Sequence, residues 1–197
     1  MNIGDLLNIN RFDLLVVLIL FGMFVLGFVQ GTIRRVLGLA SMLFSLLFAA
    51  NLRDPLGGYL AENWTAYPKE YDYMLGFGIV FVAATIAFTV VIQGFYHKQS
   101  LFEKATFADE VIGGLLGIVQ GLFLIGAVIL ILDSFFQVPG IPKSDNEIGW
   151  IRDLFNFVDG SGTADVFRTR LIPGFITVFG LLIPSDLQAF YVAVQPS

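Results

Sequence analysis

The chain of 197 residues has no cysteine and a single histidine, His97. It therefore has no disulfide, no thiolate metal ligand and no cysteine nucleophile, and one histidine cannot form a multi-histidine metal site. Charged residues are also few, 14% of the chain against about 25% in soluble domains. The 11 Lys and Arg and 16 Asp and Glu leave a net charge of −5, which gives no basic field for nucleic acid. We expect no metal, no cofactor and no nucleic-acid partner.

Apolar residues dominate the chain, at 56% with a mean hydropathy of +0.80, which indicates an integral membrane protein. A spanning helix needs about 20 apolar residues. Four stretches have no ionisable side chain, at residues 14–33, 36–52, 73–96 and 111–132. The second would reach only about 26 Å, so it either spans with snorkelling arginines at its ends or lies on the membrane. We predict an all-α membrane protein with four transmembrane helices in a domain over residues 1–136.

The remaining residues, 137–197, form a tail of different character. Residues 148–158 predict an amphipathic helix with Ile151, Leu154, Phe155 and Val158 on its apolar face. This helix could lie in the headgroup region or pack on the spans. Residues 171–183 are apolar but too short to span, which favours an interfacial or re-entrant segment.

Basic residues near the span ends divide evenly, four on each side. The adjacent pair Arg34 and Arg35 in the tightest connection favours placing the first and third connections in the cytoplasm. Both termini are then periplasmic. The stretch from Arg53 to Asp72 is expected to be a longer loop, and the first span is expected to remain as an anchor, because no cleavage pattern follows it.

Glycines recur at helical spacing in two spans. Gly113, Gly117 and Gly121 line one face of the fourth span, and Gly27 and Gly31 form a second G-x-x-x-G in the first. The faces either pack on each other within one chain or support self-association through the fourth span. The segments 27–31 and 117–121 share the pattern G-x-V-Q-G, which suggests two related helix pairs in parallel orientation.

Candidate chemistry is sparse. No ionisable side chain lies deep in a predicted span, which argues against pumps, voltage sensors and proton-coupled carriers. Asp13 and Asp109 precede spans, where a carboxylate favours a helix N-terminus. Arg34 and Arg35 either anchor the first span at lipid phosphates or form an ion pair with Asp109 or its neighbour Glu110.

Several motifs occur in an order and spacing that resemble the colicin V production protein family of bacterial inner-membrane proteins. They are Asp13, Gly27-x-x-x-Gly31, Arg34, Gly38-Leu-Ala, the acid-led segment from Asp109 to Gly121, Leu132-Asp-Ser-Phe, and Leu171-Ile-Pro. The chain departs from the family pattern at three positions. Gln30 and Gln120 stand where arginine is common, and Arg35 stands where glutamate is common.

The resemblance implies a four-span inner-membrane protein with both ends periplasmic, and a role in colicin V (toxin) production or export, or in envelope homeostasis. We interpret the chain as non-enzymatic and acting by assembly of membrane helices. Its expected partners are the lipid bilayer and either further copies or other inner-membrane proteins. One alternative is a subunit of an oligomeric channel or transporter. Another is a membrane enzyme, which would depend on His97.

Overall fold

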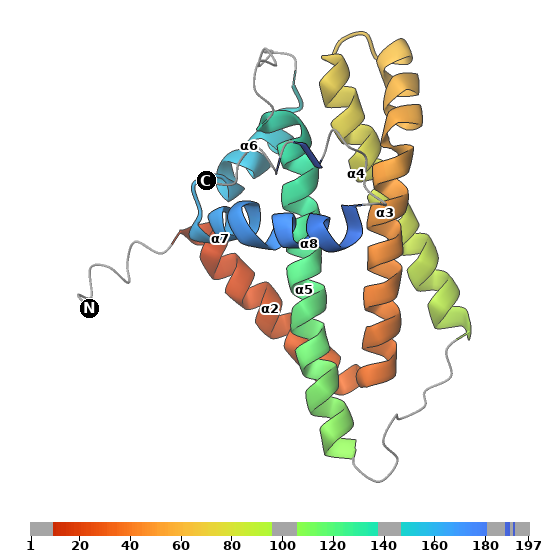
Figure 1. Ribbon diagram of the computed structural model, residues 1–197, viewed down its shortest axis with the longest axis vertical. Coiled ribbons are helices and arrows are strands. Elements are labelled where there is room, and N and C mark those ends of the chain that lie inside the picture. Colours follow the sequence, from red (N-terminus) through yellow and green to blue (C-terminus); the bar gives the residue numbers. More distant parts are fainter. Residues whose placement is uncertain (1–9, 96–105, 138–146, 181–187, 190, 192–197) are drawn as a thin grey trace, which may run out of the picture.

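The computed structural model describes residues 10–95, 106–137, 147–180, 188–189 and 191. Its four long helices are α2 (Arg11–Gln30), α3 (Thr32–Asn63), α4 (Lys69–Phe95) and α5 (Thr106–Phe136). Each contains a window long and apolar enough to cross a membrane, and the described residues include no strand. The predicted all-α class with four potential spans is confirmed. Figure 1 shows that successive helices run in opposite directions.

A single residue, Gly31, joins α2 to α3. Gly31 has φ 78°, a left-handed conformation that favours glycine, and it ends α2 and begins α3 at once. The first connection is therefore shorter than predicted, and Arg34 and Arg35 lie inside α3 instead of in a loop. Because helical residues turn by about 100° each, the two side chains take different surroundings. Arg35 is buried and Arg34 is half-buried.

The helix that contains the second predicted span is much longer than the 17 residues of that span. Helix α3 has 32 residues, or about 48 Å, so its backbone is long enough to cross the membrane, and the ionisable-free stretch 36–52 lies within it. The predicted loop from Arg53 to Asp72 is wrong, because α3 continues through Pro55 and α4 begins at Lys69. Glycines permit the tight hairpin: a side chain at Gly76 would meet the backbone nitrogen of Gly57 at 2.9 Å.

The four helices form two pairs. Helix α3 packs along α4, α2 packs along α5, and α3 also contacts α5. Helix α2 has little contact with α3, although Gly31 joins them. The core lies mainly between α3, α4 and α5, with large side chains such as Phe77 and Ile129 fully buried.

The tail folds back onto the bundle as α6 (Gly149–Val158), α7 (Gly162–Val166), a π-helical turn η1 (Phe167–Leu171) and α8 (Ile172–Phe179). Helix α6 is the amphipathic helix expected over 148–158. Its Phe155 ring stacks on Phe136 of α5 with centroids 4.5 Å apart, so the apolar face packs on the bundle. Trp150 stays 66% exposed at the start of α6.

The apolar segment predicted at 171–183 begins in η1 and continues as α8. Helix α8 crosses in front of α5 in Figure 1, instead of running along it. Its buried side chains are Ile172, Pro173 and Ile176, while Val178 is 73% exposed. Residues 181–183 lie outside the described part of the chain.

Candidate functional site

The glycines identified in the sequence lie in the contact between α2 and α5 of the same chain. A side chain at Gly27 would collide with the carbonyl oxygen of Gly113, and one at Gly117 with the carbonyl oxygen of Met23. A side chain at Gly113 would come 2.5 Å from the carbonyl oxygen of Gly27. Only glycine permits this approach, in which dispersion and weak Cα–H···O contacts hold two backbones together.

The glycine contact extends to both ends of the motif. Next to Gly113 lies Gly31, the joint of α2 and α3, with its Cα 3.0 Å from the position of an added side chain. At Gly121 the neighbours are Leu20 and Met23 side chains. Helices α2 and α5 run in opposite directions (Figure 1), so the two G-x-V-Q-G segments meet in an antiparallel contact. The first helix thus packs on the fourth, and it has little contact with the second, with which the predicted repeat would group it.

Asp109 caps the beginning of α3. Its Oδ1 accepts a hydrogen bond from the Thr32 backbone nitrogen at 3.4 Å, and the Thr32 hydroxyl donates to the Asp109 carbonyl at 3.0 Å. Within the described residues, Arg34 and Arg35 form no ion pair with Asp109 or Glu110, so that alternative is not realised. The carboxylate instead supplies an acceptor that the N-terminus of α3 needs, since Gly31 has no side chain.

Asp13 has the corresponding role for the tail. Its Oδ1 accepts from the backbone nitrogen of Thr163 at 2.9 Å, and its Oδ2 accepts from that of Gly162 at 3.3 Å. The side chain of Ser161 caps the same helix through Ala164. Asp13 therefore caps α7, from a position 150 residues away in sequence, and this partner could not be predicted from sequence spacing.

Asp133 is the second point at which the tail is held, and it is fully buried. Arg168 donates to both of its carboxylate oxygens, from Nε at 2.9 Å and from Nη2 at 2.8 Å. The hydroxyl of Tyr191 donates to Asp133 at 3.0 Å, and Arg168 also donates to Asp159 at 2.7 Å. This cluster, named here the tail clamp, joins the end of α5 to three segments of the tail.

The tail clamp keeps Arg168 charged and Tyr191 neutral. Burial opposes the charge on Arg168, but the hydrogen bonds and negative charges of Asp133 and Asp159 outweigh it and raise the pKa of the guanidinium. Burial, followed by the charge of Asp133, raises the pKa of the Tyr191 phenol. Both shifts favour a charged guanidinium at Arg168 and a neutral phenol at Tyr191 in the folded protein.

Asp72 is a buried carboxylate of another kind. It lies in the first turn of α4, one residue before the predicted third span, and it is fully buried. Neither of its carboxylate oxygens has a hydrogen-bond partner. An unpaired charge in such a place is costly, so Asp72 lowers the stability of the fold.

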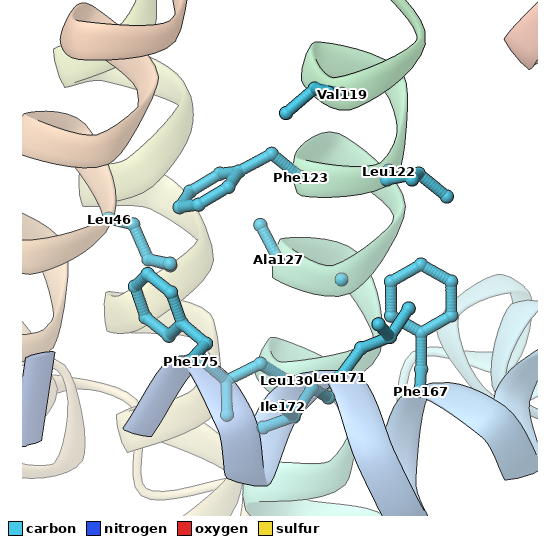
Figure 2. Close-up of a pocket in the computed structure, with 11 residues that line it drawn as sticks. Leu46, Val119, Leu122, Phe123, Ala127, Leu130, Phe167, Leu171, Ile172 and Phe175 are labelled. Atoms are coloured by element: carbon cyan, nitrogen blue, oxygen red, sulfur yellow. The ribbon is translucent and has the colours of Figure 1, made fainter. Parts of the chain in front are cut away.

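An apolar cavity of about 180 Å³ lies between α5 and the tail (Figure 2). Phe123 and Ala127 line it from α5, Phe167 and Phe175 from the tail, and Leu46 from α3. All of its lining side chains are apolar, so it suits an apolar group such as a hydrocarbon chain and offers no chemistry to a polar substrate.

Arg35 contacts Gln120 across the bundle, from α3 to α5. Its Nη1 donates to Gln120 Oε1 at 2.6 Å. Both residues stand at positions where the chain departs from the family pattern, and the structure brings these two positions together. His97, the residue on which an enzymatic interpretation would depend, lies outside the described residues.

The comparisons with known proteins give one match. The family described as colicin V production protein matches residues 12–167, which is well over half of the chain. The chain belongs to the colicin V production protein family. No curated protein and no solved structure matches it.

The match to the colicin V production protein family covers nearly all of the four long helices and two of the four residues of the tail clamp. The matched region contains Asp13, Asp133, Asp159 and the α2–α5 glycines, and it ends one residue before Arg168. The family residues that sequence analysis singled out as charges, Asp13 and Asp109, are thus helix caps between segments distant in sequence. Arg34 lines a polar cavity described below.

Proposed function

We propose that this protein is a non-enzymatic, multi-pass protein of the bacterial inner membrane that supports colicin V production or export by assembly of membrane helices. The observation that carries the proposal is the family match over residues 12–167. The contact between α2 and α5, which leaves the outer side of α2 unoccupied, supports the mechanism. We also propose that both termini lie on the periplasmic side, which four spans and a tail docked beside the start of α2 support.

The outer side of α2 is the surface we propose for contact with lipid or with a partner helix. It carries a stripe of exposed apolar side chains at spacings of three and four residues. They are Leu14, Leu18, Phe21, Val25 and Val29. Such spacing places all five on one helix face, opposite to the glycines that face α5. The bilayer is thus the first partner, and further copies or other inner-membrane proteins are candidates for the second.

Secretion by a colicin V-producing strain that lacks its own family member tests the proposal. Wild type is expected to restore the inhibition zone on a sensitive strain, and Gly117→Leu to fail, because the new side chain would push α5 off Met23. Gly174→Leu in α8 is the control, since nothing lies within 4 Å of an added side chain there and the residue is not on the proposed partner surface of α2. Toxin measured inside the cells separates production from export. Equal secretion with and without the wild-type gene would refute the role in colicin V production.

Native mass spectrometry in mild detergent tests the assembly mechanism separately. An oligomer that survives Gly174→Leu but dissociates in Gly117→Leu would show that assembly depends on the glycine contact between α2 and α5. A monomer in all three proteins would assign that face to the α2–α5 contact alone, and assembly would then require a different protein as partner. An unchanged oligomer in Gly117→Leu would contradict a role for the glycines in assembly.

A further inference from the structure

A polar cavity of about 120 Å³ lies inside the bundle, near the end where α2 turns into α3. Its polar lining comes from all four long helices, as Gln30, Arg34, Arg35, Ser41, Thr89 and Gln120. The volume is several times what one water needs. No acidic residue is among the described residues that line it. In a protein of net charge −5, the cavity is thus a local concentration of positive charge.

Arg35 is the buried charge of this cavity. Its residue is 5% exposed, and its one hydrogen-bond acceptor is the neutral amide oxygen of Gln120. The Nε atom of Arg35 is buried and has no partner. Within the described part of the chain, neither Arg34 nor Arg35 forms an ion pair. A buried guanidinium with only a neutral acceptor is incompletely compensated, and a bound anion would supply the missing negative charge.

The polar groups around Arg35 can offer hydrogen-bond donors to the cavity. Because Gln120 presents its oxygen to Arg35, its amide nitrogen points elsewhere, toward Gly38, where an added side chain would come within 3.0 Å of it. Glycine at position 38 therefore leaves room for this amide group. The hydroxyl of Ser41 already donates to the Leu37 carbonyl at 2.8 Å, so it does not add a donor. Guanidinium forks and amide nitrogens together suit a tetrahedral oxyanion.

We propose that this cavity binds a phosphate oxyanion, with Arg35 as the buried charge and Arg34 as the charge at its edge. The proposal goes beyond the proposed function, which assigns no ligand. Arg35 lies about 5 Å along α3 from its first residue, close to the end of the helix. A phosphate at this depth can come from a lipid headgroup or from free phosphate in solution, and the experiment distinguishes the two.

Binding is measured on delipidated protein in neutral detergent with two pairs of probes. Phosphatidylglycerol is compared with diacylglycerol, which lacks the phosphate, by native mass spectrometry. Inorganic phosphate is compared with chloride at equal ionic strength by the thermal unfolding midpoint. We expect wild type to bind a phosphate-bearing probe at least about tenfold more tightly than Arg35→Gln, since loss of 1.4 kcal/mol suffices for that ratio. Arg35→Lys should keep part of the affinity.

The controls separate binding from folding. Arg170→Gln removes an exposed arginine of the tail and should bind as wild type does. Arg34→Gln, at a half-buried position, should fold normally and weaken binding. Retention of phosphatidylglycerol without a response to inorganic phosphate assigns the headgroup, and a response to inorganic phosphate assigns the free anion. The proposal is overturned if neither probe binds, or if Arg35→Gln and Arg34→Gln both bind like wild type.

Discussion

Replacing the two charges of the tail clamp one at a time, and then together, tests how the tail is held on the bundle. Arg168→Met would leave the fully buried Asp133 with the Tyr191 hydroxyl as its remaining described partner. Breaking a buried ion pair in this way costs about 3–5 kcal/mol. Asp133→Leu removes both hydrogen bonds from Arg168, but Asp159 still pairs with that guanidinium. We therefore expect the loss for Asp133→Leu near the lower end of the range.

The double variant Asp133→Leu with Arg168→Met should lose less stability than either single variant. No buried charge is left, the carboxylate of Asp159 is 42% exposed and reaches water, and the Tyr191 hydroxyl loses an acceptor at a cost of about 1–3 kcal/mol. The coupling should then be at least about 3 kcal/mol, whereas independent sites add within about 0.5 kcal/mol.

Unfolding in mild detergent with added denaturing detergent, followed by far-ultraviolet circular dichroism, measures these differences. Limited proteolysis reports whether the tail has left the bundle. Arg170→Met is the control, because that side chain is exposed two residues further along. Additive losses, or a double variant less stable than both single variants, would refute the claim that Asp133 and Arg168 hold the tail as a pair.

Three further outcomes follow from the structure, each measured as the free energy of unfolding in the same detergent system. Asp72→Leu should raise the free energy of unfolding by about 1–3 kcal/mol, because it removes a buried carboxylate without hydrogen-bond partners. Glu70→Leu, on the exposed side of the same turn, should not raise it. A lower free energy of unfolding in Asp72→Leu would contradict the cost assigned to this carboxylate. Gly31→Ala should cost about 1–2 kcal/mol, since φ is 78° and the new side chain would lie 2.6 Å from Asp109 Oδ2; a neutral effect would refute the strain. Tyr191→Phe should cost about 1–3 kcal/mol at neutral pH. Because burial raises the pKa of the Tyr191 phenol in the folded protein, the stability advantage of wild type over this variant should persist below about pH 10 and decline only above it. An advantage that grows as the pH rises above about 10 would contradict a raised pKa.

Hydropathy alone predicted the four long helices, because the bilayer requires backbone groups to bond within each segment. The boundaries were less predictable. Arg53 and Pro55 looked like the start of a loop, yet α3 continues beyond them as part of a hairpin with α4. A helix can continue beyond the apolar layer of the membrane. Hydropathy therefore predicts which residues lie in that layer more directly than it predicts where the helix ends.

A contact of the candidate site could be predicted only where the sequence of one of its two segments has a recognisable pattern. The spacing of Gly113 and Gly117 indicated a close helix contact, and the structure places it against α2. The partners of Asp13 and Asp133 lie in the tail, far away in sequence, so no local pattern could pair them. For Asp133, the one signal was its place in the Leu132-Asp-Ser-Phe motif at the end of a span.

The pairing of α2 with α5 also determines an order of events during synthesis. Ribosomes deliver the first span to the membrane before the fourth exists, and α2 has little contact with the α3 helix that follows it. The glycine face of α2 therefore has no α5 to pack against while the α3–α4 hairpin is made. Only the arrival of α5 closes the bundle, and only then can Asp133 receive the tail. A chain released before that point would present an unmatched glycine face to its neighbours in the membrane.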